Sequence, residues 1–255
     1  MWKILTERLR QGSRTMAWPD GPAPELDPRW RGAPIIDRER CAPECEACAE
    51  ACPTDAITLG AERAVVDLGR CLFCTDCVAA CPSGAVGHGR EFSLAARERE
   101  ALLSDGRVLA KARALDAASR KLFGRSLKLR QVSAGGCNAC EADVNVLGTI
   151  GWDLGRFGIQ FVASPRHADG LLITGPVTEH MELALRKTWE AIPAPKLVIA
   201  VGACAISGGP FVDHPEVLNG ASSVVPVDLF IPGCPPHPLT TLDGLLRLLG
   251  RVAER

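Results

Sequence analysis

Short apolar runs alternate with longer amphipathic stretches over residues 128–255. The runs are rich in β-branched residues and end at Gly, Pro or charged residues, as buried strands do. The expected strands lie within 127–132, 159–164, 170–175, 196–202 and 224–233, and the expected helices within about 139–148, 178–190 and 238–251. This alternation predicts an α/β domain with a mostly parallel sheet and helices on its faces. In such sheets, ligands collect in loops at the carboxyl ends of the strands.

Residues 1–40 follow a different pattern. An amphipathic start places Trp2, Ile4, Leu5 and Leu9 roughly on one helical face. The tract "WPDGPAPELDPRWRGAP" follows, and its prolines block both a helix and a central strand. We therefore expect an extended N-terminal arm that docks on another surface, such as a partner subunit, with a loose tail as the alternative.

Residues 91–127 are rich in Ala, Leu, Arg and Glu, which favours a helical linker of one or two helices with a break at Gly106. The chain then divides into four parts. They are the arm (1–40), a cysteine-rich domain (41–90), the helical linker (91–127) and the α/β domain (128–255).

Cysteine changes this picture most. The chain has 12 cysteines in 255 residues and a net charge of -1, so no global charge points to nucleic acid. Its first residues, "MWKILTERLRQGSRTM", lack the apolar core of a secretory signal, and no apolar run is long enough to span a bilayer. A reducing, cytoplasmic compartment follows, in which abundant cysteine indicates cofactor ligation rather than disulfides.

Eight of these cysteines form two similar runs, each followed by proline. The runs are Cys41, Cys45, Cys48, Cys52 and Pro53, then Cys71, Cys74, Cys77, Cys81 and Pro82. The second run has the C-x2-C-x2-C-x3-C-P spacing of bacterial ferredoxins, and 41–90 resembles a two-cluster ferredoxin domain. This resemblance implies one 4Fe-4S cluster on Cys41, Cys45, Cys48 and Cys81, and another on Cys71, Cys74, Cys77 and Cys52. Zinc is the alternative, although it prefers two separated pairs of ligands.

The first run departs from the ferredoxin spacing because three residues, rather than two, separate Cys41 from Cys45. The extra residue must bulge from the loop. Cys41 is consequently the least certain ligand among the eight.

The other four cysteines lie beyond predicted strands. Cys137 and Cys140 follow the first strand, Cys204 a later one and Cys234 the last. Flanking glycines permit close approach of the backbone. We therefore expect Cys137, Cys140, Cys204 and Cys234 to form one four-cysteine site at an edge of the sheet.

The motifs "GGCNACE", "SPRHADGLLITGPV", "VGACAISGGPF" and "IPGCPPHP" carry a second resemblance, over about 129–251. They resemble the 20 kDa subunit of respiratory complex I and the small subunits of membrane-bound nickel–iron hydrogenases of the formate hydrogenlyase type. The resemblance implies a flavodoxin-like fold and a third 4Fe-4S cluster. Complex I subunits have adjacent cysteines at the first position, so the C-x-x-C-E form here resembles the hydrogenase branch. With "GSRTMAWP" and "RWRGAPIIDRERC" ahead of the ferredoxin-like runs, the chain resembles a natural fusion of two subunits.

These resemblances imply an electron-transfer subunit of an oxidoreductase complex, carrying three 4Fe-4S clusters and no complete active site. The implied partners are a hydrogenase-type large subunit, a redox donor subunit and membrane subunits, which would hold the chain at the inner face of the cytoplasmic membrane. A complex I-like quinone or other acceptor module without nickel is one alternative, and a zinc-bound scaffold is another. No glycine-rich nucleotide motif is present, so direct nucleotide binding is not expected.

Single polar residues remain open to two interpretations. Glu141 could bridge to a partner's active site or cap a helix. Arg166 and His167 could support the third cluster. For His88, His180, His214 and His237, as for His167, an ordinary surface or hydrogen-bonded histidine is the simpler interpretation.

Overall fold

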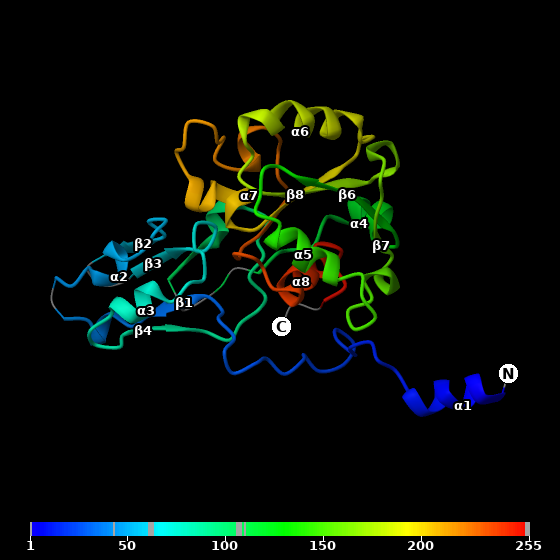
Figure 1. Ribbon diagram of the computed structural model, residues 1–255, viewed down its shortest axis with the longest axis horizontal. Coiled ribbons are helices and arrows are strands. Elements are labelled where there is room, and N and C mark those ends of the chain that lie inside the picture. Colours follow the sequence, from blue (N-terminus) through cyan, green and yellow to red (C-terminus); the bar gives the residue numbers. More distant parts are fainter. Residues whose placement is uncertain (1, 43, 61–63, 106–108, 110, 253–255) are drawn as a thin grey trace.

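A five-stranded parallel sheet forms the C-terminal half of the chain, with the strand order β10–β9–β8–β6–β7 (Figure 1). The computed structural model describes residues 2–42, 44–60, 64–105, 109 and 111–252. The strands are β6 (Leu127–Ser133), β7 (Ile159–Phe161), β8 (Gly170–Thr174), β9 (Leu197–Val201) and β10 (Leu229–Ile231). If these five strands are numbered 1 to 5 along the chain and the sheet is read from β7 to β10, the order is 2-1-3-4-5, as in flavodoxin-like folds. The predicted fold class is therefore confirmed.

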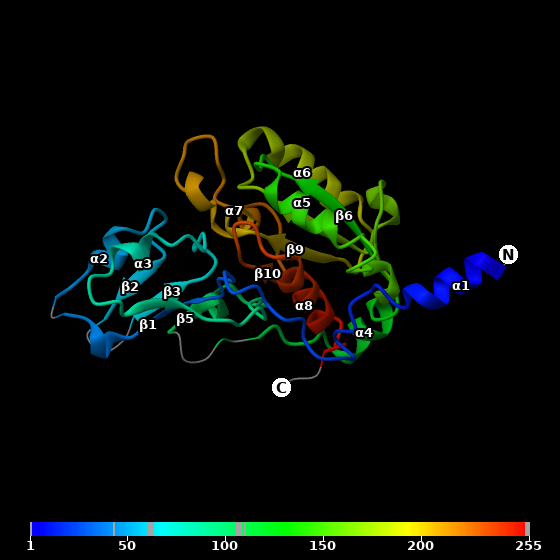
Figure 2. The same cartoon turned by 60° about the horizontal axis from the view of Figure 1, so that its bottom comes forward.

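Helices cover both faces of this sheet (Figure 2). The helices are α5 (Ala139–Val146), α6 (Glu179–Ala191), α7 (Ala203–Ser207) and α8 (Pro238–Leu248), and short 3-10 turns are η3 (Leu154–Phe157), η4 (Pro165–His167), η5 (Gly209–Phe211) and η6 (Ala221–Ser223). Alternate residues of β8 point to opposite faces. Leu172 packs in the cluster that contains α5 and α8, whereas Leu171 and Ile173 pack in the cluster that contains Leu185 of α6.

The cysteine-rich half is a small α+β unit built from two repeated halves. Its elements are β1 (Pro34–Ile36), η1 (Arg38–Arg40), α2 (Ala47–Glu50), β2 (Ile57–Leu59), β3 (Ala64–Asp67), α3 (Asp76–Ala80) and β4 (Val86–His88). Antiparallel pairs join β1 to β4 and β2 to β3. The unit therefore begins before residue 41, because β1 supplies the partner of β4.

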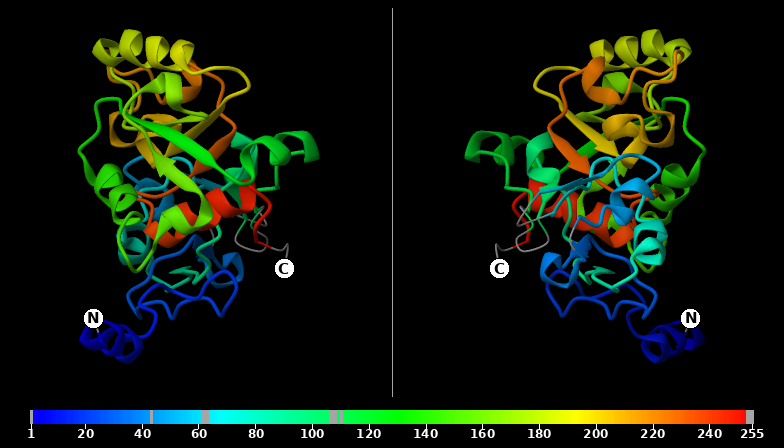
Figure 3. Two further views of the ribbon diagram at one scale, coloured as in Figure 1. Left: turned by 90° about the vertical axis from the view of Figure 1, so that its right-hand side faces the viewer. Right: turned by 90° about the vertical axis from the view of Figure 1, so that its left-hand side faces the viewer.

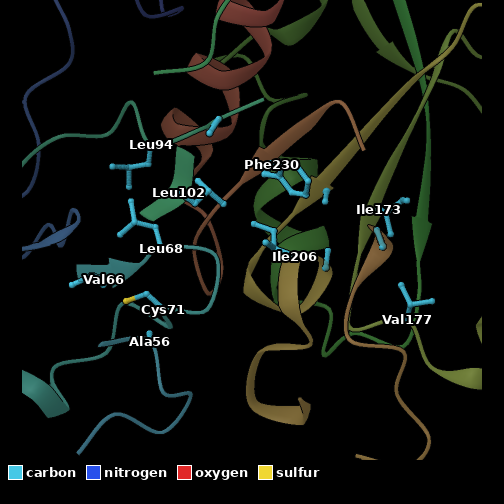
Figure 4. Packing of buried hydrophobic residues seen from close by; sticks show 14 of the residues in the cluster. Ala56, Val66, Leu68, Cys71, Leu94, Leu102, Ile173, Val177, Ile206 and Phe230 are labelled. Carbon is cyan, nitrogen blue, oxygen red and sulfur yellow. The ribbon is translucent and has the colours of Figure 1, made fainter. Parts of the chain in front are cut away.

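Both halves of the chain share one hydrophobic core. Leu68 and Leu102 beside the cysteine runs belong to the same buried cluster as Ile206 and Phe230 of the α/β unit (Figure 4). A hydrogen bond from Ser207 Oγ to the carbonyl oxygen of Gly69, 3.0 Å long, crosses the same boundary. The two units are consequently packed against each other and not merely tethered.

The expected helical linker is wrong over most of its length. Residues 91–98 contain no helix, and Ala96 exchanges two backbone hydrogen bonds with Phe230 of β10, at 3.0 and 2.8 Å. Beyond them come η2 (Arg99–Leu102), β5 (Leu103–Ser104), which pairs with β3, and a single helix, α4 (Ala117–Phe123). Gly106, the predicted break, lies outside the described residues. Pairing with the free edge of β10 outweighs the helix propensity of this segment.

The last predicted strand is shorter than expected. Residues 224–233 supply only the three residues of β10, because the chain turns through η6 just before it and Pro226 has no N–H to donate to a neighbouring strand.

The proline-rich arm lies on its own chain. The Arg156 guanidinium donates 2.6 Å hydrogen bonds to the carbonyl oxygens of Met16 and Trp18. The Trp18 ring is only 6% exposed and meets Phe92 edge to face, with ring centroids 5.9 Å apart. The extended arm is thus explained by contacts within the molecule, and the loose-tail interpretation fails for this segment.

Helix α1 (Trp2–Gln11) precedes the arm and projects from the rest of the molecule (Figure 3). Its large apolar side chains are exposed, namely Trp2, Ile4, Leu5 and Leu9. Docking of this helix on a partner subunit stays a prediction. Among the described residues, no helix is long and apolar enough to cross a membrane.

Replacing Trp18 by Ala should destabilise the protein by about 3 kcal/mol, because a large ring leaves a packed site. The check is the thermal unfolding temperature of the full chain. Trp2→Ala is the matched control. Since Trp2 is 84% exposed, its removal should change stability by less than about 0.5 kcal/mol. Equal melting temperatures for the two variants would contradict the packing described for the arm.

Candidate functional site

All twelve cysteines are free thiols. Within the two runs, the fourth cysteine of each has the same surroundings. The Ala56 N–H donates to Cys52 Sγ, and the Ala85 N–H donates to Cys81 Sγ, each at 3.2 Å. Because each donor lies four residues after its cysteine, the turn after each proline is built alike. These backbone donors can stabilise a thiolate or the sulfur of a metal-bound cysteine.

The structure brings Cys52 of the first run into the second. Burial raises the pKa of the Cys71 thiol to about 12, and the neighbouring thiols that add to this rise are Cys52, Cys77 and Cys74. The pKa of Cys77 is raised to about 11, again by burial first and then by its neighbours, led by Cys74. These four cysteines make up one of the two sets expected from the sequence.

The other expected set gathers around Cys48. Its pKa is raised by burial and by the nearby thiols of Cys41 and Cys81. Cys45 and Cys41 line one cavity of about 480 Å³. The crossed arrangement, three thiols from one run with the fourth from the other, stays a prediction.

The longer first gap is accommodated without disturbing the approach to the second cysteine. Glu44 precedes Cys45 and has φ 58°, while Phe73 precedes Cys74 and has φ 53°. Equivalent residues share this uncommon left-handed conformation. The approach to the second cysteine is thus alike in the two runs. Pro43 is outside the described residues.

Three strand ends deliver the last four cysteines to one edge of the sheet. Cys137 and Cys140 follow β6, Cys204 is the second residue of α7 just after β9, and Cys234 follows β10. Burial raises the pKa of Cys140 strongly, and the thiols of Cys204, Cys234 and Cys137 raise it further. The expected convergence is therefore seen, at the carboxyl edge where ligands of such sheets lie.

Glycine makes this convergence possible at two positions. Gly202 has φ +93°, and a Cβ there would lie 2.6 Å from Cys140 Sγ. At Gly209, with φ +55°, a Cβ would lie 2.9 Å from Cys204 Sγ. Any other residue would push a thiol out of the group, so the backbone is shaped around the sulfur atoms.

The third set of thiols adjoins the second. The pKa of Cys234 is raised by burial and then by Cys137 and Cys74, and Cys74 belongs to the second run. Phe73 and Cys234 line one cavity of about 660 Å³, together with Trp30 and His237. The three groups of thiols consequently follow one another, with the Cys41 group at the far end.

Glu141 lies beside the third group and faces inward. Thr174 Oγ1 donates a 2.6 Å hydrogen bond to its Oε1. Burial alone would raise the pKa of Glu141, but hydrogen bonds from Ser133 and Thr174 outweigh it and hold the pKa below its usual value. Glu141 therefore ties α5 to β6 and β8, a role the sequence reasoning missed, and it also lies in the first turn of α5, where an acidic residue suits the helix N-terminus.

Arg166 and His167 do not join the thiols. They form the exposed turn η4, which leads into Gly170, the first residue of β8, whereas the thiols lie beyond the opposite ends of the strands. Of the two interpretations left open for them, the structure favours the ordinary surface one, because the loop after β7 turns back before it reaches that edge.

Two other histidines have structural contacts. The ring nitrogens of His88 lie 3.0 Å from the Gly32 carbonyl oxygen and 3.2 Å from that of Cys74. His237 caps α8 by accepting a hydrogen bond from the Leu239 N–H at Nδ1. His180 and His214 are exposed. The ordinary interpretation suits all four.

Zinc would require its ligands to converge on one point, with Zn–S distances of about 2.3 Å. In the part of the chain that the structure describes, no three His, Cys, Asp or Glu side chains are close enough to bind a single metal ion.

Comparison with known proteins follows the same division of the chain. Residues 137–248 match the family model of the NADH ubiquinone oxidoreductase 20 kDa subunit, and residues 31–85 match that of the 4Fe-4S dicluster domain. The probable membrane-bound hydrogenase subunit mbhJ of Pyrococcus furiosus is 41% identical over 134 residues, which cover 52% of this chain and 80% of that protein.

Two further relatives come from different complexes. Formate hydrogenlyase subunit 7 of Escherichia coli is 44% identical over 135 residues, covering 53% of each chain. An NADH-quinone oxidoreductase subunit of Clostridium beijerinckii is 44% identical over 118 residues, covering 46% of this chain and 70% of that protein. This chain belongs to the family of the 20 kDa subunit of NADH ubiquinone oxidoreductase, fused here to a 4Fe-4S dicluster domain.

Proposed function

We propose that this chain is the electron-transfer subunit of an oxidoreductase complex and relays single electrons to or from a catalytic large subunit. The observation that carries the proposal is the cavity that Phe73 and Cys234 line together, since Phe73 is the neighbour of Cys74 and the cavity therefore adjoins both the second and the third group of thiols. The family membership supports the same conclusion. The chain has no complete active site of its own.

The proposed ligand sets are those expected from the sequence. Cys41, Cys45, Cys48 and Cys81 form the first, Cys71, Cys74, Cys77 and Cys52 the second, and Cys137, Cys140, Cys204 and Cys234 the third. The donor chemistry fits 4Fe-4S clusters, which take four cysteine thiolates each and supply one-electron transfer when bound. Loading would require the buried thiols to release protons, because only thiolates are ligands.

A partner subunit could bind where the third group of thiols is exposed to solvent. Cys137 and Cys234 are exposed, so a second protein can approach this group of thiols and shield it from water. We propose a large subunit of the nickel–iron hydrogenase type here, with the donor subunit near Cys41 and Cys45. Relatives named as hydrogenase and formate hydrogenlyase subunits support this assignment, as does the C-x-x-C spacing.

A complex I-like partner without nickel is the second candidate, favoured by the similar identity of the NADH-quinone oxidoreductase relative from Clostridium beijerinckii. In either case the chain would be peripheral, held by membrane subunits at the cytoplasmic face. Nickel analysis of the co-purified complex separates the two candidates, because only the first requires nickel in the large subunit.

Replacing Gly202 by Ala should remove the third site alone. The new Cβ would displace Cys140 Sγ, so the iron content should fall from about twelve atoms to about eight, with one signal lost in electron paramagnetic resonance. Gly87→Ala is the control, because a Cβ at that glycine meets nothing within 4 Å. Full iron content in the Gly202 variant would contradict the proposed ligand role of Cys140.

Cys204→Ala tests function at the same site. The two signals of the dicluster domain should remain, one signal should vanish, and electron delivery to the large subunit should stop, because the last step of the path is missing. Anaerobically purified protein is compared with the unmodified chain by electron paramagnetic resonance and by turnover of the complex. Unchanged turnover would rule out the proposed path, and a colourless zinc protein would rule out a redox role altogether.

A further inference from the structure

The two cysteine runs differ at one position that their repeated geometry makes equivalent. Leu68 lies three residues before Cys71, and Arg38 lies three residues before Cys41. Leu68 is 2% exposed and belongs to the shared hydrophobic core. An arginine thus stands in the first run where the second run has a buried leucine.

The Arg38 side chain is partly buried, and two of its three nitrogen atoms lack partners among the described residues. Nε and Nη1 are inaccessible to solvent and make no hydrogen bond in the described part of the molecule. A buried cation without a partner is costly, so such groups are normally paired with an anion. Strand β1 and the turn η1 fix the backbone here, since Asp37 Oδ1 accepts the Glu39 N–H at 3.2 Å.

The cavity beside Arg38 contains the thiols of the first set. Arg38, Cys41 and Cys45 line the same space of about 480 Å³. With its thiolates, an oxidised 4Fe-4S cluster is an anion, and N–H groups that point at its sulfur atoms are among the features that set its potential. The missing counter-charge of Arg38 therefore corresponds to the group expected in this cavity.

We propose that Arg38 donates hydrogen bonds to the cluster held by Cys41, Cys45, Cys48 and Cys81, and that it raises the reduction potential of this site. The inference rests on the proposed function, since it needs a cluster in the first site. On reduction, one electron arrives from a donor protein, no covalent bond forms or breaks, and the site gains one negative charge. A fixed cation stabilises that added charge. The first and second sites consequently differ in potential although their thiols are arranged alike.

The rival partners of Arg38 are Glu44 and Glu46, which line the same cavity. If either carboxylate neutralised Arg38 in solution, removing the guanidinium would change the potential little. The experiment therefore measures the potential of each site directly.

The test compares Arg38→Leu with the unmodified full chain in a redox titration followed by electron paramagnetic resonance. Leucine is the residue that the second run has at this place. At a fixed potential, the reduced-to-oxidised ratio of the first site should fall about tenfold, which is about 59 mV for one electron. The signals of the other two sites should not move. Loss of a signal in Cys45→Ala identifies the first site.

Arg40→Leu is the matched control. Arg40 belongs to the same turn, carries the same charge and is exposed, and its Nη2 donates to the Ser83 carbonyl oxygen at 3.2 Å. Its removal should leave the midpoint of the first site nearly unchanged. Equal midpoints for Arg38→Leu and the unmodified chain, or equal shifts in both variants, would overturn the proposal.

The iron content shows whether the Arg38→Leu variant still holds its cluster. If this variant loses iron, the midpoint potentials of Arg38→Gln and Arg38→Lys are measured instead. Glutamine keeps a hydrogen-bond donor without the charge, and lysine keeps the charge without the planar fork. Both midpoints should fall below that of the unmodified chain, and two unshifted midpoints would refute a role for Arg38. An unmodified chain without cluster signals would instead refute the proposed function.

Discussion

The close packing of buried thiols is the constraint on which this structure depends. Thiols packed together and away from water resist ionisation, as the raised pKa values of Cys71 and Cys140 show. The backbone is shaped to bring them together. Gly202 and Gly209 leave room for the sulfur atoms of Cys140 and Cys204, and left-handed residues at Glu44 and Phe73 precede Cys45 and Cys74. Bound iron would stabilise the thiolate form that burial disfavours.

The shared hydrophobic core fixes the dicluster domain and the α/β unit relative to each other. Ile206 and Phe230 pack with Leu68, so the dicluster domain sits against α7 and β10, the elements next to Cys204 and Cys234. That contact sets the separation of the second and third groups of thiols. Electron transfer within proteins depends on such separations, and here they are fixed by ordinary side-chain packing. The N-terminal arm is also held in place, because Arg156 donates a hydrogen bond to the Trp18 carbonyl oxygen and the Trp18 ring packs against Phe92.

Cysteine spacing and strand–helix alternation were enough to predict the two units, whereas the three ligand sets stay a prediction. Both signals are local, and the fold only had to bring them together. The prediction of a helical linker was wrong because its structure depends on a contact with a distant part of the chain. Its Ala, Leu and Arg residues favour a helix, yet the free edge of β10 pairs with Ala96, a contact that no local pattern contains. The position of Arg166 could not be predicted either, since nothing near it in the sequence reveals where the loop after β7 turns back. Arg38 could have been noticed by aligning the two runs.

The boundary between the two units has a consequence for how the protein can be assembled. In the part of the chain that the structure describes, the shared core and the Ser207–Gly69 hydrogen bond cross it. The continuous chain keeps the two surfaces at a high effective local concentration, as a tether does for any interface. The association of the two units is therefore independent of how much protein the cell contains.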